Sequence, residues 1–222
     1  MSDPSTVPPL APASLTRDST ASYVYTSGTT GPPKGVIQTH GNHLANVEQA
    51  SLSGVFAVGG SLFLYLPLAH SFARLVYYVG FLTSTSITFP AITDHQSSKL
   101  DLSSIARDIR EGSSTVLPSV PRLFEKMASA VQTRASQKGL AARIMRLCIN
   151  NAQKVQSVRL RGGRLGTWDE MIFNGLSGVR KKIKLQLFGA EFHHGISGGA
   201  KLDPEVNRFF NALEILICEG YG

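Results

Sequence analysis

Two hydrophobic periods alternate along the chain. Short apolar runs alternate with longer stretches in which apolar residues recur every three or four positions. The runs predict strands over residues 22–25, 62–66, 86–89, 115–117, 192–196 and 214–218. The longer stretches predict helices over residues 40–54, 72–79, 102–109, 121–127, 140–158, from 167 onwards and 204–213. Because strands and helices alternate, we expect an α/β fold with a mostly parallel sheet flanked by helices.

Capping residues and prolines sharpen the limits of these elements. Short polar side chains favour helix starts because they accept hydrogen bonds from free backbone N–H groups. The expected N-caps are Asp101, Ser119, Thr167 and Asp203. Pro118 is expected to end the strand before it, and Pro121 to lie in the first turn of the next helix.

The composition is that of a packed globular protein with excess positive charge. Hydrophobic residues make up 42% of the chain and charged residues 17%, which argues against disorder. The formal net charge of +7 predicts an anionic partner: a nucleotide, coenzyme A, an acidic membrane surface or nucleic acid. Aromatic residues are not interleaved with the basic ones, so we expect no nucleic-acid binding.

The positive charge gathers in the third quarter of the chain. Arg159, Arg161 and Arg164 precede a second group at residues 180–184. We interpret the run at 180–184 as a solvated helix face, with a binding patch as the alternative.

Length and local composition predict one domain behind a short extension. Residues 1–17 are expected to be a linker or terminal piece, and residues 18–222 the folded domain. The first residues lack the apolar core of a secretory signal. Gly, Pro, His and Arg residues interrupt the apolar region 55–82, so we interpret it as a buried strand and helix and not as a membrane span. Cys148 and Cys218 form no metal pattern and suit a reducing cytoplasm.

Residues 25–36 read YTSGTTGPPKGV and carry the clearest chemical signal. Glycines let the backbone come close to a ligand, and successive N–H groups can line a surface for anions. The Ser and Thr hydroxyls add donors, and Lys34 adds a positive charge. Lys34 is followed by Gly35, so this is not a Walker A loop, and the GxGxxG order of dinucleotide folds is also missing. The segment is suited to holding a polyphosphate.

This segment closely resembles the phosphate-binding signature of the adenylate-forming (AMP-binding) enzymes. Three further segments resemble the same superfamily: LPLAHSFAR at 66–74, SGGAKL at 197–202 and EGYG at 219–222. Together with VPRLFEK at 120–126 and the helices before Ser197, they are most similar to bacterial long-chain fatty-acid–CoA ligases. The resemblance implies part of the large N-terminal domain of such an enzyme.

The resemblance implies a nucleotide site made of three segments. The β- and γ-phosphates would be held by Ser27, Gly28, Thr29, Thr30, Gly31 and Lys34, and Thr26 would be the hydroxyl ligand of Mg²⁺. The backbone of Gly198, Gly199 and Ala200 would pass along the adenine and the acyl carbonyl. Tyr221 would stack on the adenine, flanked by Glu219 and Gly220.

By the same resemblance, the parent enzyme joins a fatty acid to AMP with ATP and Mg²⁺, and then transfers the acyl group to coenzyme A. His70 either lines the acyl pocket or thiolation tunnel, or is an ordinary core histidine; both readings stay open. His193 and His194 are neighbours in a predicted strand, so their side chains should face opposite ways and not form a metal pair.

The chain departs from the superfamily pattern in two places. Lys201 replaces the usual Pro after Gly-Gly-Ala, and EGYG lacks the Thr and Glu that usually follow it. We therefore expect a piece of the AMP-binding domain that is truncated at both ends. We expect no turnover by this piece alone, and self-association through exposed sheet edges.

Alternatives remain for the function and the location. The parent could be another adenylating enzyme, such as an aryl-acid ligase or a peptide-synthetase adenylation domain, or the chain could be a non-catalytic nucleotide-binding module. We expect a cytoplasmic location and leave open a peripheral contact with the inner face of the membrane.

Overall fold

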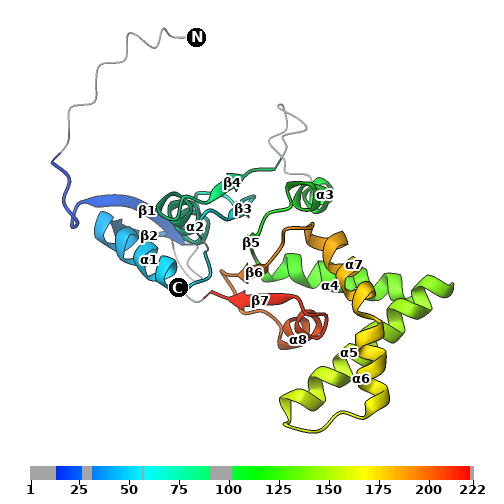
Figure 1. Cartoon of the computed structure of the whole chain (residues 1–222). Coiled ribbons are helices and arrows are strands. Elements are labelled where there is room, and N and C mark those ends of the chain that lie inside the picture. The colour runs from blue at the N-terminus through cyan, green and yellow to red at the C-terminus, as the bar shows by residue number, and fades with distance from the viewer. Residues whose placement is uncertain (1–13, 27–31, 57, 91–101, 221–222) are drawn as a thin grey trace.

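The computed structural model describes residues 14–26, 32–56, 58–90 and 102–220, which form two separate sheets (Figure 1). The first is an antiparallel hairpin of β1 (Thr20–Thr26) and β2 (Lys34–Thr39). The second holds β3 (Ser61–Phe63), β4 (Ser86–Thr88), β5 (Val116–Ser119), β6 (His194–Ser197) and β7 (Leu216–Glu219). These five strands are all parallel, in the order β4-β3-β5-β6-β7. The predicted α/β fold with a mostly parallel sheet is confirmed.

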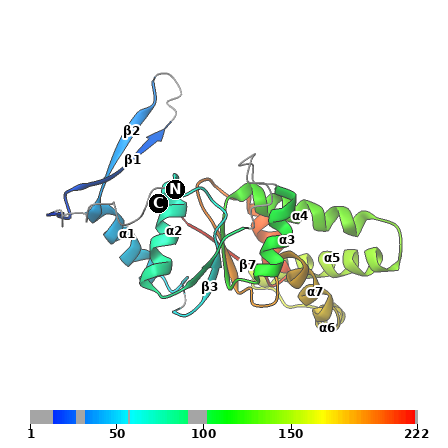
Figure 2. The same ribbon diagram turned by 90° about the horizontal axis from the view of Figure 1, so that it is seen from above.

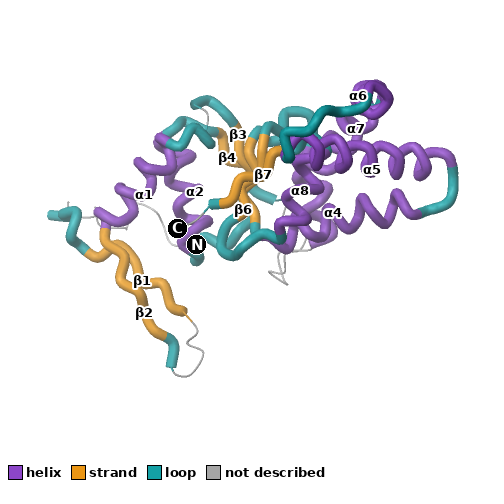
Figure 3. The backbone as a smooth tube through the Cα atoms, turned by 90° about the horizontal axis from the view of Figure 1, so that it is seen from below, coloured by secondary structure: helices purple, strands orange, loops and turns teal. Residues whose placement is uncertain are grey.

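Helices cover the parallel sheet on both sides. Their bounds are α1 (His40–Leu52), α2 (Ser71–Leu82), α3 (Leu102–Gly112), α4 (Pro121–Ser136), α5 (Leu140–Leu160), α6 (Thr167–Gly175), α7 (Ser177–Phe188) and α8 (Pro204–Ala212). Helices α1 and α2 lie on one side of the sheet, and α4, α5, α7 and α8 lie on the other (Figure 3). None of the described helices is long and apolar enough to cross a membrane.

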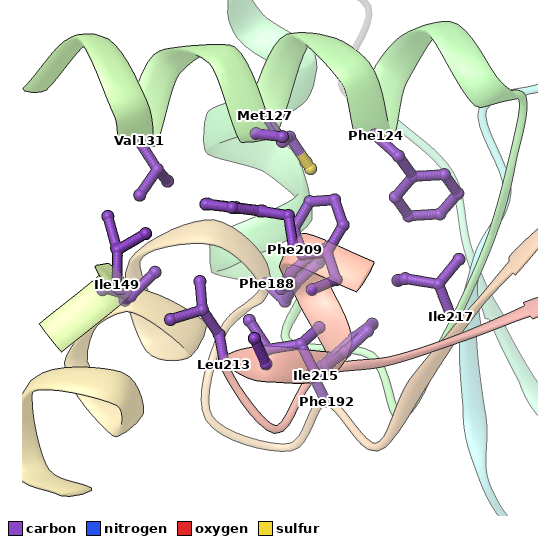
Figure 4. Packing of buried hydrophobic residues seen from close by; sticks show 14 of the residues in the cluster. Phe124, Met127, Val131, Ile149, Phe188, Phe192, Phe209, Leu213, Ile215 and Ile217 are labelled. Carbon is purple, nitrogen blue, oxygen red and sulfur yellow. The ribbon is translucent and has the colours of Figure 1, made fainter. Parts of the chain in front are cut away.

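The core divides into two clusters because side chains alternate across a strand. Leu62 and Val116 point to the α2 side, while their neighbours Phe63 and Leu117 point to the opposite side. The larger cluster lies on that opposite side and is rich in aromatic rings (Figure 4). Phe188 stacks on Phe192 with ring centroids 4.1 Å apart. Because helices bury both faces of the sheet, successive residues of its inner strands are apolar, and such strands appear in the sequence as short continuous apolar runs.

Two expected element limits at β5 need correction. Pro118 does not end its strand: it lies inside β5 opposite Ile196. The pairing of β5 with β3 is recorded only at Val116, so β5 has a single partner strand at Pro118 and a missing N–H is tolerated there. Ser119 is the last residue of β5 and not a cap, because Val120 is the N-cap of α4.

Of the two other predicted N-caps in the described residues, one is confirmed and one is wrong. Asp203 is confirmed as the N-cap of α8, where its Oδ1 accepts from the Glu205 N–H at 2.8 Å. Thr167 is instead the first residue of α6, and Gly166 is the N-cap. Asp101 lies outside the described residues.

Helix α7 shows that the basic run at 180–184 is not one solvated face. Lys181 and Lys182 are exposed, but Arg180 is only 3% exposed. Its guanidinium lies 3.6 Å from the centre of the Phe173 ring and donates to the Phe173 carbonyl at 2.6 Å. Its Nε donates to Glu214 Oε2 at 2.8 Å. The interpretation as a solvated face is therefore wrong for Arg180, which joins α6, α7 and the turn before β7.

Candidate functional site

The carboxyl ends of β5, β6 and β7 bring three polar residues into one row. The strand register places Ser197 opposite both Ser119 and Glu219. In a parallel sheet, residues in register point to the same face, so the three side chains share one face at this edge. Ligands of open α/β sheets bind outside the carboxyl ends of their strands, so this edge is the candidate site.

The loop after β6 begins under a ring from α2. A Cβ atom added to Gly198 would lie 2.8 Å from Cζ of Phe72 and 2.9 Å from its Cε1. The Gly198 N–H donates to the Ser119 carbonyl at 2.9 Å, which ties the loop to the end of β5. Gly199 follows with φ +82°, a conformation that favours glycine. The structure therefore requires glycine at both positions of the SGGA segment: Gly198 because of the close ring, and Gly199 because of its positive φ.

The segment after β7 is tied to the same loop. The Gly220 N–H donates to the Ser197 carbonyl at 2.8 Å. Glu219 Oε2 accepts from the Leu202 N–H at 3.3 Å, just before α8. Glu219 and Gly220 are therefore held against the two ends of the segment 197–202, and within that segment Gly199 and Ala200 are exposed.

Sequence reasoning missed the polar groups beneath this loop. The Tyr65 hydroxyl lies 2.6 Å from Ser119 Oγ. Burial raises the pKa of Tyr65, partly opposed by hydrogen bonds to Ser119 and Val120, so the phenol stays neutral near pH 7. Ser197 is 1% exposed and its Oγ has no partner among the described residues. The signal available was position: each serine is the last residue of its strand.

The orphaned hydroxyl of Ser197 gives one test of the implied nucleotide. A buried polar atom without a partner is costly, so a ligand or water that reaches it would be bound favourably. Ser197 lies two residues before Gly199, which is exposed and has open space at its Cβ position. These residues fit the adenylate that the resemblance implies.

The predicted phosphate segment lies mostly outside the described residues, since Ser27, Gly28, Thr29, Thr30 and Gly31 are not among them. Its two ends are described and face each other across the hairpin. Thr26 pairs with Lys34, and Thr26 Oγ1 donates to the Lys34 carbonyl at 3.5 Å.

The hairpin that carries Thr26 and Lys34 is not part of the parallel sheet. It extends away from that sheet beyond α1 (Figures 2 and 3). Both residues are exposed. The structure therefore does not bring Thr26 or Lys34 next to Gly198 and Glu219, and their roles stay predictions. Tyr221 lies outside the described residues.

The described residues contain no cluster of side chains typical of a protein metal site. Within these residues, no group of three or more His, Cys, Asp or Glu side chains could hold a metal ion. Mg²⁺ bound with a nucleotide needs only one or two protein oxygens, because the phosphates and waters supply the rest. Thr26 therefore remains a predicted Mg²⁺ ligand.

The histidines and Cys218 take unremarkable positions. His70 is exposed at the N-cap of α2, two residues before Phe72, so it is not a core histidine. His193 is exposed and precedes β6, while His194 is half-buried and is the first residue of that strand, so the prediction that both lie in one strand is wrong for His193. Burial raises the pKa of the Cys218 thiol, so it stays protonated and weakly nucleophilic.

His194 makes stability depend on pH. Burial lowers its pKa below the ordinary value, and a backbone hydrogen bond to Val55 opposes this only in part. The unfolded chain then takes up a proton at a higher pH than the folded chain, so stability is lost as pH falls below about 6.5. We expect His194→Asn to reduce the loss of unfolding free energy between pH 7 and pH 5, measured by urea denaturation. His193→Asn is the matched control and should reduce that loss only slightly, because the charge of His193 is the smallest of the causes that lower the pKa of His194. An equal effect of both variants would contradict the assignment.

Comparisons with known proteins agree with the sequence resemblance. The family described as AMP-binding enzyme matches residues 2–222. The chain is 33% identical over 213 residues to "Long chain acyl-CoA synthetase 6, peroxisomal" of Arabidopsis thaliana, covering 92% of this chain and 27% of that protein. It is 29% identical over 214 residues to the long-chain-fatty-acid–CoA ligase FadD15 of Mycobacterium tuberculosis, covering 95% and 34%.

A solved structure shares the fold. The A-PCP didomain of carboxylic acid reductase from Segniliparus rugosus, in complex with AMP, superimposes with a TM-score of 0.63 at 21% identity. The match covers 98% of this chain and 26% of that one. The chain thus spans about a quarter to a third of the length of the proteins that it matches.

Proposed function

Because the chain belongs to the AMP-binding enzyme family, we propose that it forms the part of an adenylation domain that holds the adenylate. The observation that carries this proposal is the junction of the SGGA and EGYG segments, joined by the Gly220 N–H to Ser197 carbonyl bond of 2.8 Å. This junction lies at the carboxyl edge of the sheet and presents the backbone of Gly199 and Ala200 to solvent.

The proposed reaction of a protein of the relatives' length has two steps. A carboxylate oxygen attacks the α-phosphorus of ATP, and pyrophosphate leaves, giving an acyl adenylate. The thiol of coenzyme A then attacks the acyl carbon, and AMP leaves. Both partners of the first step are anions, so positioned N–H donors, the cation of Lys34 and Mg²⁺ held by Thr26 would neutralise the developing charge.

We further propose a long-chain fatty acid as the carboxylic acid. Support comes from the names of the relatives at 33% and 29% identity and from the LPLAHSFAR segment, whose Phe72 lies against Gly198. Carboxylic acid reductase shares the fold at 21% identity, so a different acid class is the second candidate. In this proposal His70, exposed at the N-cap of α2, lines the route to the acyl group.

A binding measurement tests the site on the chain itself. We expect the 222-residue chain to bind a non-hydrolysable long-chain acyl adenylate (an acyl sulfamoyl adenosine) more tightly than the benzoyl or aminoacyl analogue in calorimetry. Ala200→Glu should weaken binding about tenfold, because it adds an anion beside the phosphate position. Ala130→Glu, an equal charge change at an exposed residue of α4, is the control and should not weaken it.

The outcomes separate the two parts of the proposal. Equal weakening by both Glu variants, or no binding of any adenylate analogue, would contradict the site. Preference for the benzoyl analogue would retain the site and contradict the fatty acid. We expect no ATP–pyrophosphate exchange by the 222 residues alone, and sustained acid-dependent exchange would refute that expectation.

A further inference from the structure

The charge of the chain is concentrated in one helical arm, which we define as residues 121–188, from α4 to α7. The arm holds 14 of the 22 Lys and Arg residues but only three of the 15 acidic ones, Glu125, Asp169 and Glu170. The remainder of the chain holds 8 basic and 12 acidic residues and is therefore net negative. The excess charge that predicted an anionic partner is thus a property of the arm, while the SGGA and EGYG segments lie outside it.

A groove in this arm combines apolar walls with cations. It has a volume of about 610 Å³ and lies between the end of α4, the start of α5 and α7. Leu140, Ile144 and Val179 form apolar walls, and the cations lining it are Arg134, Lys138 and Lys182. Among its lining residues in the described chain there is no carboxylate. None of the three cations forms an ion pair within the described residues.

The end of α4 and the start of α5 are fixed to each other, but apolar side chains of α5 there are exposed to solvent. Arg146 Nε donates to the Ala135 carbonyl at 3.1 Å, which ties α5 to the end of α4. On α5, Leu140 is 74%, Ile144 38% and Leu147 51% exposed. Their spacing of four and three residues places them in one stripe along the helix. A stripe of exposed aliphatic residues beside unpaired cations marks an interaction surface more strongly than either feature alone.

We propose that this groove and stripe dock on an anionic lipid bilayer, with Arg134, Lys138 and Lys182 at the headgroups and Leu140, Ile144 and Leu147 entering the interface. Helices that lie on membranes combine basic residues with an apolar face in this way. Nucleic acid fits the surface less well, because it would use the cations but offer nothing to the aliphatic stripe, and none of the lining residues is aromatic. The docking does not depend on the proposed adenylation, and its test involves no turnover.

Vesicle sedimentation with the full 222-residue chain tests this proposal. We expect binding to vesicles of phosphatidylcholine with one quarter phosphatidylglycerol, and much weaker binding to phosphatidylcholine alone. The triple variant Arg134→Gln, Lys138→Gln, Lys182→Gln should partition about a hundredfold more weakly, since each cation near the surface contributes on the order of a tenfold change or slightly less. Leu140→Ser with Ile144→Ser should weaken partition about tenfold without any change of charge.

A charge-matched control separates the groove from the overall charge. Arg17→Gln, Arg110→Gln and Arg208→Gln remove three exposed cations outside the arm and should leave partition within about threefold of the parent chain. Equal losses in the two triple variants would overturn the proposal, as would equal binding to neutral vesicles. Binding to duplex DNA that is lost in the groove variant but kept in the Leu140→Ser, Ile144→Ser variant, without vesicle binding, would overturn it in favour of a nucleic acid. Circular dichroism checks that each variant folds.

Discussion

Replacement of Arg180 by alanine is expected to lower the free energy of unfolding by about 2–4 kcal/mol. The side chain is buried, stacks on Phe173 and donates to the Phe173 carbonyl, so alanine leaves a gap and an unpaired acceptor. The ion pair with Glu214 contributes less, because the Glu214 side chain is 58% exposed and water screens it. Urea denaturation monitored by circular dichroism measures the change.

Lys181→Ala is the matched control for this prediction. Lys181 is the next residue of the same helix and the same basic run, but it is exposed. Its removal should change stability by no more than about 0.5 kcal/mol. If the two variants lost equal stability, or if Arg180→Ala were neutral, the buried stacking geometry would be wrong.

Gly198→Val is expected to cost about 3 kcal/mol and to abolish binding of the acyl adenylate analogue. The added Cβ would meet the Phe72 ring at 2.8 Å, and its methyl groups would press further into the ring that covers the loop. Relief requires a shift of α2 or of the loop, and a shifted loop loses the bond from the Gly198 N–H to the Ser119 carbonyl. Thermal unfolding and calorimetry measure the two effects.

Two further variants test whether the Phe72 ring is the cause. Gly178→Val, at a helical glycine with open space around its Cβ position, should change stability by no more than about 0.5 kcal/mol. In a Phe72→Ala background the cost of Gly198→Val should fall by more than half, since contacting residues are not additive. An unchanged cost in that background would show that the ring does not require the glycine.

The meeting of the SGGA and EGYG segments could be predicted from sequence because its determinants are local. SGGA and EGYG each follow an apolar run, and parallel strands end at a common edge, so their meeting follows from the fold class. The Phe72 contact and the Tyr65–Ser119 bond at 2.6 Å could not be predicted in the same way. They join residues more than fifty positions apart. The hydrophobic periodicity of one element shows which of its faces is buried, but not which other element packs against that face.

The hairpin illustrates the same limit. The sequence predicted a strand at residues 22–25, but not its partner β2 or its separation from the parallel sheet. In β2 the neighbours Val36 and Ile37 are both exposed, so this strand has no alternation of apolar and polar residues to match a buried face. The roles of Thr26 and Lys34 consequently remain predictions.

The alternation of strands and helices, the Asp203 cap and the family could be inferred from the chain alone, because hydrophobic period, capping chemistry and short motifs are properties of neighbouring residues. Which of several similar basic residues is buried, which glycine lies beneath a ring and where unpaired cations line an apolar groove depend on how distant segments pack. Arg180 and Lys182 are two positions apart in one basic run, yet Arg180 is buried against Phe173 and Lys182 lines a surface groove. Packing between distant segments makes that distinction, and charge patterning along the chain does not contain it.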